Sequence, residues 1–162
     1  EVCHALRISE KELGDTPVES VSTSRFKLIV PLKEKSTLDQ LNPDFEELWR
    51  LCDQYDTSGF YPFVVEKRGG ACVLHARQFP NRAGYTEDPA TGVAASALSA
   101  YMIRRQIFPV KEGWNRFTIY QGHAMGRPGI LLADAFYDKG KIARTRVCGF
   151  AGLREIPAEG LL

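Results

Sequence analysis

The chain has 162 residues, a length typical of one domain, and 44% of them are hydrophobic. Its 21 Lys and Arg residues nearly balance 20 Asp and Glu residues, so the formal net charge is +1. This balance offers no basic surface for nucleic acid and no acidic disordered tail, and no uncharged run reaches the roughly 20 apolar residues that span a membrane.

The start of the chain and its cysteines indicate a reducing compartment. The first residues, Glu-Val-Cys-His, lack the basic and apolar regions of a signal peptide and also lack an initiator methionine. We therefore expect a cytoplasmic protein, and the start is compatible with the back half of a longer one. The four cysteines show no Cys-x-x-Cys spacing, so we expect buried, reduced thiols and no metal site: Cys3, Cys52, Cys72 and Cys148.

The first third of the chain predicts a short helix and a strand. Ser9 and Glu12 form a capping-box pattern, and Gly14 ends the helix that it predicts. Residues 18–25 are rich in serine and are expected to be a polar connection. Residues 26–32 are apolar and β-prone, which predicts a strand that ends near its proline.

An amphipathic helix is predicted next. Asn42-Pro43-Asp44 is a typical helix start, with Asn42 expected as the cap and the proline in the first turn. Apolar residues then recur at a spacing of three to four, which predicts one face buried in a core: Phe45, Leu48, Trp49 and Cys52. We expect this helix to end near Tyr55.

The second half of the chain predicts one apolar helix among many short strands. Residues 91–106 are almost free of charge until Arg104, and a helix that is apolar on all sides is a buried helix. Strands are predicted over residues 60–65 and 71–79 as a hairpin, then over 116–121, 129–137 and 141–150, with a further edge strand at 153–156. This order favours an α+β fold in which a curled, mixed β-sheet forms a half-barrel around a buried central helix.

The segment before the buried helix is the first candidate site. Glu87-Asp88-Pro89-Ala90-Thr91-Gly92 leads directly into its first turn, where backbone N–H groups lack acceptors and the helix dipole is positive. Gly92 would let an anion approach these donors closely. The alternative is that Asp88 or Thr91 is only the helix cap, although a cap needs a single residue of this kind.

Two further groups of polar residues could line the same pocket. Residues 120–128 contain two glycines and a proline, which indicates a tight turn that could point Gln121 and Arg127 at a carboxylate. His75 and Arg77 are two positions apart and so share one face of a strand. The alternatives are a simple hairpin turn and arginines on a solvated face. The histidines show no metal-ligand spacing.

Together these segments resemble a known family. Arg77-Gln78-Phe79-Pro80, then residues 84–95, then 121–128 resemble, in this order, the C-terminal half of the PhzF-like phenazine-biosynthesis family, which is similar in fold to diaminopimelate epimerase. Residues 6–17 resemble the family's linker into its second domain, and residues 147–161 resemble its C-terminal strand.

The resemblance implies an architecture and a chemistry. Family members have two similar domains, each a curled sheet around a central helix, with the site in the cleft between them. They are biosynthetic isomerases or epimerases that use carboxyl groups for proton transfer, need no metal or organic cofactor, and are commonly homodimers. The best known acts on trans-2,3-dihydro-3-hydroxyanthranilate. We therefore expect residues 1–162 to be one domain whose N-terminal partner domain is absent from this chain.

The resemblance also implies roles for individual residues. Asp88 matches the family's aspartate at the helix mouth, which is expected to be catalytic, and Gly92 matches the glycine whose backbone faces the ligand. Val93 stands where the family usually has serine, so one hydroxyl donor is missing. The family's catalytic glutamate and a histidine belong to the other domain. The expected substrate-binding residues are Gly92, Val93, Thr91, Glu87, Gln121 and Arg77.

Three hypotheses remain open at this point. The chain supplies half the site of a PhzF-like isomerase that acts on a small carboxylate. Alternatively, it belongs to a racemase or epimerase of the same fold, which Val93 favours. In the third hypothesis it is a non-catalytic half-domain that binds a carboxylate or a protein partner, since an open cleft wall would expose apolar surface.

Overall fold

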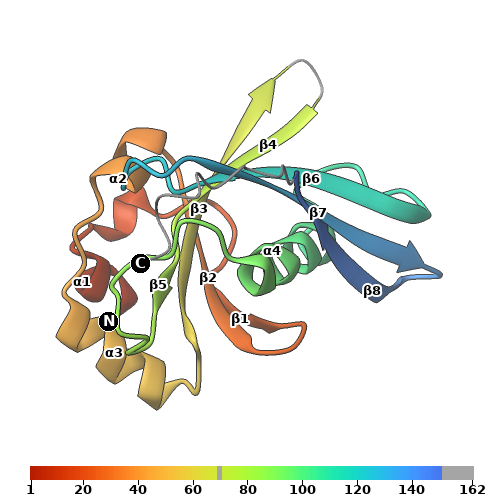
Figure 1. The fold of residues 1–162 in the computed structure, drawn as a ribbon. Coiled ribbons are helices and arrows are strands. Elements are labelled where there is room, and N and C mark those ends of the chain that lie inside the picture. The colour runs from red at the N-terminus through yellow and green to blue at the C-terminus, as the bar shows by residue number, and fades with distance from the viewer. Residues whose placement is uncertain (69–70, 151–162) are drawn as a thin grey trace, which may run out of the picture.

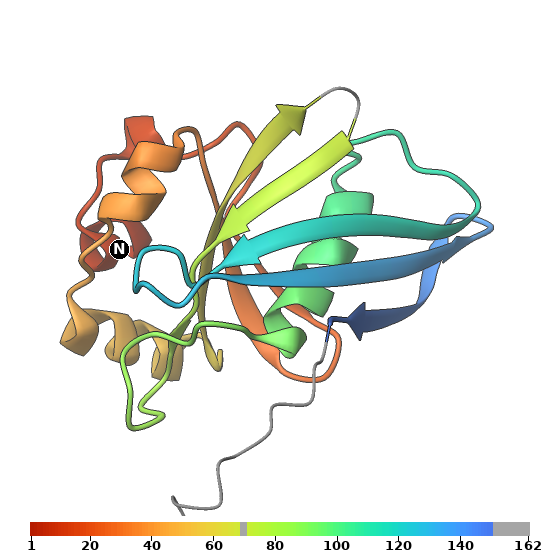
Figure 2. The same cartoon turned by 45° about the horizontal axis from the view of Figure 1, so that its top comes forward.

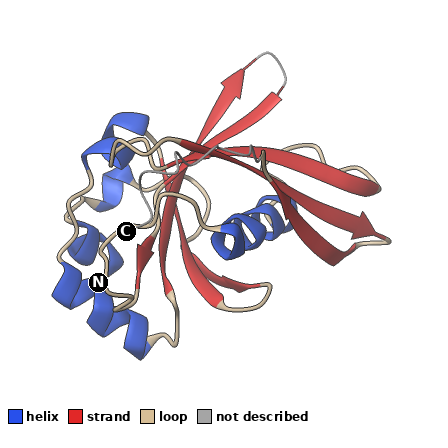
Figure 3. Cartoon of the chain, in the orientation of Figure 1, coloured by secondary structure: helices blue, strands red, loops and turns tan. Residues whose placement is uncertain are grey.

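One curled β-sheet encloses a single long helix in the computed structural model, which describes residues 1–68 and 71–150 (Figures 1 and 3). The sheet has eight strands in the order β1-β2-β3-β4-β6-β7-β8, with β5 paired to β3. The elements are α1 (Val2–Leu6), the 3-10 helix η1 (Glu10–Glu12), β1 (Glu19–Ser22), β2 (Phe26–Leu32), α2 (Lys35–Gln40), α3 (Phe45–Gln54), β3 (Gly59–Arg68), β4 (Ala71–Ala76), β5 (Phe79–Pro80), α4 (Gly92–Arg104), β6 (Gly113–Gln121), β7 (Gly129–Asp138) and β8 (Lys141–Cys148). The α+β fold with a buried central helix is therefore confirmed.

The sheet is mixed. β2 runs parallel to β3, and β4 runs parallel to β6, whereas the other neighbouring strands are antiparallel. The sheet curls so that α4 lies between its two edges, with β1 and β2 on one side and β7 and β8 on the other (Figure 2). Most of α4 is buried on every side, as its apolar composition predicts.

Two apolar cores lie on opposite faces of this sheet. Along β2, Ile29 belongs to the core around α4, whereas Leu28 and Val30 belong to the core under α1, α2 and α3. Alternation along a strand explains this division, because successive side chains point to opposite faces. α4 therefore fills the inner face, and the three N-terminal helices cover the outer face of β2 and β3 (Figure 1).

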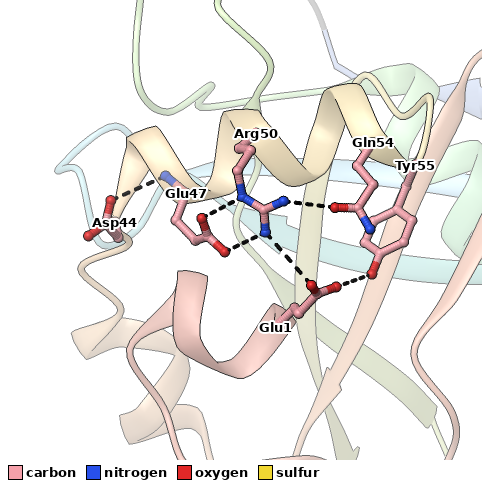
Figure 4. Close-up of polar contacts among 6 residues, drawn as sticks. All are labelled: Glu1, Asp44, Glu47, Arg50, Gln54 and Tyr55. Atoms are coloured by element: carbon pink, nitrogen blue, oxygen red, sulfur yellow. Dashed lines mark hydrogen bonds and ion pairs between the residues drawn. The ribbon is translucent and has the colours of Figure 1, made fainter.

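Polar contacts at the surface join the first helix to α3 (Figure 4). The Arg50 guanidinium donates to both carboxylate oxygens of Glu47 at 2.7 Å and to Gln54 at 2.8 Å, and it lies 3.8 Å from the Glu1 carboxylate. The Tyr55 hydroxyl donates to Glu1 at 2.6 Å. The hydrogen bonds from Arg50 lower the pKa of Glu47. Because these side chains bind one another, the cluster connects the start of α1 to α3.

Several expected elements differ in detail. The capping box is present, because the Glu12 carboxylate accepts from the Ser9 N–H at 2.8 Å, but it opens only a 3-10 turn. The expected polar connection contains strand β1, and α1 and α2 were not expected. The cap of α3 is Asp44, whose carboxylate accepts from the Glu47 N–H at 3.2 Å, and not Asn42. β2 spans Phe26–Leu32, as expected, and the strand expected at 153–156 lies outside the described residues.

The described cysteines are free thiols, but they are not all buried. Cys52 is buried in the core under α3, and desolvation raises its pKa to about 12. Cys3 and Cys148 are half-buried, and the side chain of Cys72 lies outside the part that the structure describes. Among the described residues, no helix is long and apolar enough to cross a membrane, and no group of three His, Cys, Asp or Glu side chains is placed to hold a metal.

Candidate functional site

The N-terminus of α4 opens at the end of the loop that carries Asp88. Thr91 is the cap residue, yet its side chain accepts no hydrogen bond from the first turn. The first helical hydrogen bond runs from Ala95 N–H to the Thr91 carbonyl at 3.0 Å. Within the part of the chain that the structure describes, no side chain accepts from the N–H groups of Gly92 and Val93, so the partial positive charge of the helix end suits an anion.

Asp88 lies at this helix end and is held from two sides. Its N–H donates to the Gln78 carbonyl at 3.0 Å in an isolated antiparallel bridge between the loop and the segment after β4. Its carboxylate accepts from the Thr91 hydroxyl at 2.5 Å. The side chain is half-buried. Asp88 is thus a fixed carboxylate at the start of α4.

Gln121 supports the loop from behind. It is fully buried at the end of β6, and its amide nitrogen donates to the Asp88 carbonyl at 2.6 Å and to the Thr91 hydroxyl at 3.1 Å. Its amide oxygen accepts from the Tyr61 hydroxyl at 2.9 Å. Burial raises the pKa of Tyr61, and the charge of Asp88 adds to this rise. Every polar atom of Gln121 has a protein partner, so in this structure Gln121 positions the loop.

The turn after β6 packs closely against the same loop. Gly122 has a φ of 81°, and a Cβ there would collide with the Arg127 carbonyl and lie 2.9 Å from the Pro89 carbonyl oxygen. Only glycine fits this left-handed position at such close approach. The sequence predicted that Arg127 could bind a carboxylate. In the structure Arg127 is exposed, and its N–H closes the turn by donating to the Gly122 carbonyl at 2.9 Å.

Arg77 and Glu87 form an ion pair with each other. The guanidinium donates to both Glu87 oxygens, at 2.9 and 2.7 Å, and the two side chains are 11% and 10% exposed. Its remaining nitrogen donates to carbonyls at the end of α2, including Leu41 at 2.8 Å. These contacts occupy the whole guanidinium, so the pair ties the loop to α2. His75 contacts a different partner, the Glu66 carboxylate, at 2.8 Å.

Gly92 and Val93 form the open rim of the site. Among the described residues, a Cβ on Gly92 would come within 4 Å only of Val147, at 3.9 Å, so these residues leave room over its backbone. Val93 is 36% exposed. Other large apolar side chains are also exposed, among them Tyr85 in the preceding loop and Val147 at the end of β8. An open apolar rim around a polar helix end is the surface expected of one wall of a cleft.

Two functional candidates escaped the sequence reasoning. Lys27 is 6% exposed, and its ammonium group donates to the Ser58 carbonyl at 3.2 Å. Gln78 is 1% exposed, and neither atom of its amide has a hydrogen-bond partner among the described residues. The available signal for Lys27 was its charge within an otherwise apolar strand. Gln78 is part of the segment Arg77-Gln78-Phe79-Pro80, but the sequence predicts no role for it.

Comparison with known proteins identifies the family. Residues 2–155 match the family described as phenazine biosynthesis-like protein, PhzC-PhzF. An uncharacterized isomerase of Clostridium acetobutylicum is 30% identical over 148 residues, which are 91% of this chain and 49% of that protein. The trans-2,3-dihydro-3-hydroxyanthranilate isomerase of Pseudomonas chlororaphis is 29% identical over 151 residues, 92% of this chain and 49% of that protein.

Solved structures show the same fold. A PhzF-family phenazine biosynthesis protein of Bacillus anthracis matches with a TM-score of 0.74 and 20% identity over 90% of this chain and 49% of that one. A predicted epimerase of Pseudomonas aeruginosa matches with a TM-score of 0.64 and 25% identity over 93% of this chain and 49% of that one. The chain spans about half the length of the relatives that it matches.

Proposed function

Because the chain belongs to the phenazine biosynthesis-like (PhzC-PhzF) family, we propose that it supplies the C-terminal half of the active site of a cofactor-independent isomerase. The reaction moves a proton on a small substrate that carries a carboxylate. The observation that carries this proposal is the Asp88 carboxylate, fixed by Thr91 beside the uncapped N-terminus of α4. The names of the relatives, most of them isomerases, support the reaction class.

In this proposal each part of the site has its own task. The N–H groups of Gly92 and Val93 bind the substrate carboxylate, since they are free donors at the positive end of a helix. Asp88 then gives or takes the proton at the adjacent carbon. The same helix end stabilises the negative charge that develops when a carbon next to a carboxylate loses its proton. Gln121 and Thr91 keep the aspartate in place and do not touch the substrate.

The second acid–base group is proposed to lie outside this chain, in a partner domain. A proton shift between two carbons needs one group to remove a proton and a group to deliver one. In this proposal the partner domain closes over Val93 and the open space at Gly92, and it brings the second group to the face of the substrate opposite Asp88. The homodimer that is common in the family would be built from such two-domain chains.

The test uses protein expressed from its complete reading frame. Asp88→Asn keeps the size of the side chain and its hydrogen bond with Thr91 but removes the proton-accepting carboxylate. We expect it to lower turnover of trans-2,3-dihydro-3-hydroxyanthranilate, and deuterium uptake from D₂O, by about 10²–10⁴-fold while the near-UV circular dichroism is unchanged. Asp56→Asn, at an exposed turn, is the control. Turnover near the wild-type level in folded Asp88→Asn protein would falsify the assignment.

One observation favours a second candidate, a racemase or epimerase that acts on amino acids. Val93 cannot supply a hydroxyl donor, so the carboxylate site of this chain is less polar than the family usually provides. Proton exchange at the α-carbon of a panel of amino acids, followed by NMR in D₂O, separates the two. Exchange without isomerisation of trans-2,3-dihydro-3-hydroxyanthranilate would select the racemase, and the absence of both activities would favour a binding role.

A further inference from the structure

The outer face of β6, β7 and β8 carries no helix among the described residues (Figure 2). The core under α1, α2 and α3 takes its strand residues from β2, β3 and β5, and none from these three strands. Phe117 and Ala133 belong instead to the core around α4, on the inner face. Because successive side chains of a strand alternate between the two faces, their neighbours Arg116 and Asp134 lie on the outer face.

One row across the three strands places a buried carboxylate between two arginines. Arg116 of β6 lies opposite Asp134 of β7, which lies opposite Arg146 of β8. Asp134 is 1% exposed, and it accepts from Nε and Nη2 of Arg116 at 2.7 and 2.9 Å and from Nε of Arg146 at 2.8 Å. One negative charge thus compensates two guanidinium groups, and within the described part of the chain the terminal nitrogens of Arg146 have no hydrogen-bond acceptor.

The adjacent row on this face holds a third arginine and two aromatic rings. Trp114 lies opposite Phe136, which lies opposite Arg144. The guanidinium carbon of Arg144 is 4.6 Å from the centre of the Phe136 ring and 5.3 Å from that of Trp114, and the guanidinium carbon of Arg146 is 4.1 Å from Trp114. None of the hydrogen bonds and ion pairs between described residues includes Arg144, and contacts with rings hold a guanidinium without neutralising it.

This face therefore has an excess of positive charge that is held in a fixed geometry. Three guanidinium groups share the carboxylate of Asp134. The next acidic residue along β7, Asp138, lies opposite Lys141, so a lysine matches its charge. A guanidinium group that rings already hold loses little freedom on binding, and it can donate two parallel hydrogen bonds to a carboxylate.

The neighbouring surface favours a protein as the source of that carboxylate. Ile130, on the same face of β7, is 46% exposed, and Leu132 is half-buried between it and Asp134. Arginine and aromatic side chains beside apolar ones are typical of the centres of protein interfaces. Nucleic acid fits less well, because arginines already lie over the rings of Trp114 and Phe136 on which bases would stack. A second copy that presented the same face would bring arginine against arginine.

We propose that the outer face of β6, β7 and β8 is a docking surface for an acidic segment of a partner protein. Carboxylates of the partner bind the guanidinium groups of Arg144 and Arg146, and an apolar side chain of the same segment packs on Ile130. The surface lies on the opposite face of the sheet from α4, so this inference does not rest on the proposed isomerase function.

The test follows the indole N–H signal of Trp114 by NMR in ¹⁵N-labelled protein expressed from its complete reading frame. Trp114→Phe assigns this signal by its loss. The probe is the peptide acetyl-Glu-Glu-Leu-Glu-Glu-amide at low ionic strength, and the comparisons are acetyl-Lys-Lys-Leu-Lys-Lys-amide and a single-stranded oligothymidine. We expect the acidic peptide to shift the Trp114 signal in a saturable way that added salt weakens, the basic peptide to leave it unchanged, and the oligothymidine to bind more weakly than the acidic peptide.

Matched variants separate this surface from general charge attraction. Arg144→Gln should lower the affinity for the acidic peptide about tenfold, because a hydrogen-bonding cation is lost. Arg25→Gln removes the same charge from an exposed turn between β1 and β2 and should bind like the wild type. An unchanged Trp114 signal, an equal loss of affinity in Arg25→Gln, or tighter binding of the oligothymidine would overturn the proposal. A Trp114 signal that depends on protein concentration, with a dimer in sedimentation, would also overturn it, because a second copy would then occupy the face.

Discussion

The Tyr61 hydroxyl, near the start of β3, donates a 2.9 Å hydrogen bond to the side-chain oxygen of Gln121, at the end of β6. Both side chains are fully buried. Gln121 extends this hydrogen-bond network, because its side-chain nitrogen donates to the Asp88 carbonyl and to the Thr91 hydroxyl. The centre of the sheet is thereby linked to the loop that carries the candidate catalytic residue.

Removing either end of this link should destabilise the protein. Tyr61→Phe leaves one buried acceptor unpaired and should cost about 1–2 kcal/mol. Gln121→Leu should cost more, because the Tyr61 hydroxyl and the Asp88 carbonyl both lose a partner. Urea denaturation of the two variants and of the double variant measures the coupling. Because Tyr61→Phe has no hydroxyl that could lose its partner, the double variant should lose less stability than the sum of the losses of the two single variants. Strict additivity would contradict the link.

Gly122→Ala should disrupt the loop before α4. Glycine adopts a positive φ there, and the added Cβ would collide with the Arg127 carbonyl and press on that of Pro89. Gly126→Ala is the matched control, because Gly126 also has a positive φ, 69°, but no atom of the described residues lies within 4 Å of its Cβ position. We expect the free energy of unfolding to fall by about 1 kcal/mol in the control, from backbone strain alone, and clearly more in Gly122→Ala. Equal thermal stabilities would show that the close approach to Pro89 does not matter.

Breaking the Arg77–Glu87 pair should be costly, unlike most ion pairs in this chain. Both side chains are nearly buried, so Glu87→Gln leaves the guanidinium charge without its counter-ion and should destabilise by about 3 kcal/mol. The control is Asp39→Asn, which breaks the exposed pair with Lys35 and should cost less than about 1 kcal/mol. Chemical denaturation measures both. A small loss of stability in Glu87→Gln would show that the fold does not need this carboxylate, which would then be available to bind a substrate.

The fold could be predicted where sequence patterns act locally. α4 was recognised because a helix with no polar face must be buried, and β2 was recognised from an unbroken apolar run. β1 was missed because Ser20 and Ser22 look like a loop, and the strand exists through its antiparallel pairing with β2. α2 was missed because it buries only Leu38 and its last carbonyls are bound by Arg77, a residue about 40 positions away.

In the candidate site, too, local features could be predicted from the sequence, whereas contacts between distant residues could not. Asp88, Thr91 and Gly92 are neighbours in sequence, and the start of a buried helix is visible from composition. Arg77 and Glu87 were assigned to a substrate because the sequence does not show that each would satisfy the other. The burial of Lys27 could not be predicted either, because its only signal in the sequence is a charged residue within an apolar strand.

Acid sensitivity should depend on Asp134. This carboxylate, 1% exposed on β7, accepts from Arg116 on β6 at 2.7 Å and from Arg146 on β8 at 2.8 Å. The hydrogen bonds from Arg116, and then those from Arg146, lower its pKa below the ordinary 3.8. A carboxyl whose native pKa is depressed stabilises the fold fully above its unfolded value and loses that contribution as pH falls through the native value.

The free energy of unfolding of the wild-type protein should therefore fall as the pH drops below about 4, and less steeply in Asp134→Asn. That variant should also be less stable at pH 7, because two arginines lose their acceptor. Asp138→Asn, exposed at the end of the same strand, is the control and should retain the wild-type slope. Urea unfolding at a series of pH values measures the slopes. Identical slopes for wild type and Asp134→Asn would place the acid-sensitive group elsewhere.

Val93→Ser should strengthen carboxylate binding at the end of α4. Val93 is 36% exposed at the rim of the site, so the substitution should change stability little. A serine hydroxyl at this helix position adds one donor beside the free backbone N–H groups, and one hydrogen bond to a carboxylate is worth about 1–2 kcal/mol, or roughly five- to thirtyfold in affinity. Val93→Ala separates this gain from the loss of bulk. Titration of complete-frame protein with benzoate, followed by NMR of the Gly92 amide, measures binding. If Val93→Ser and Val93→Ala bind equally, the carboxylate does not lie against the first turn of α4.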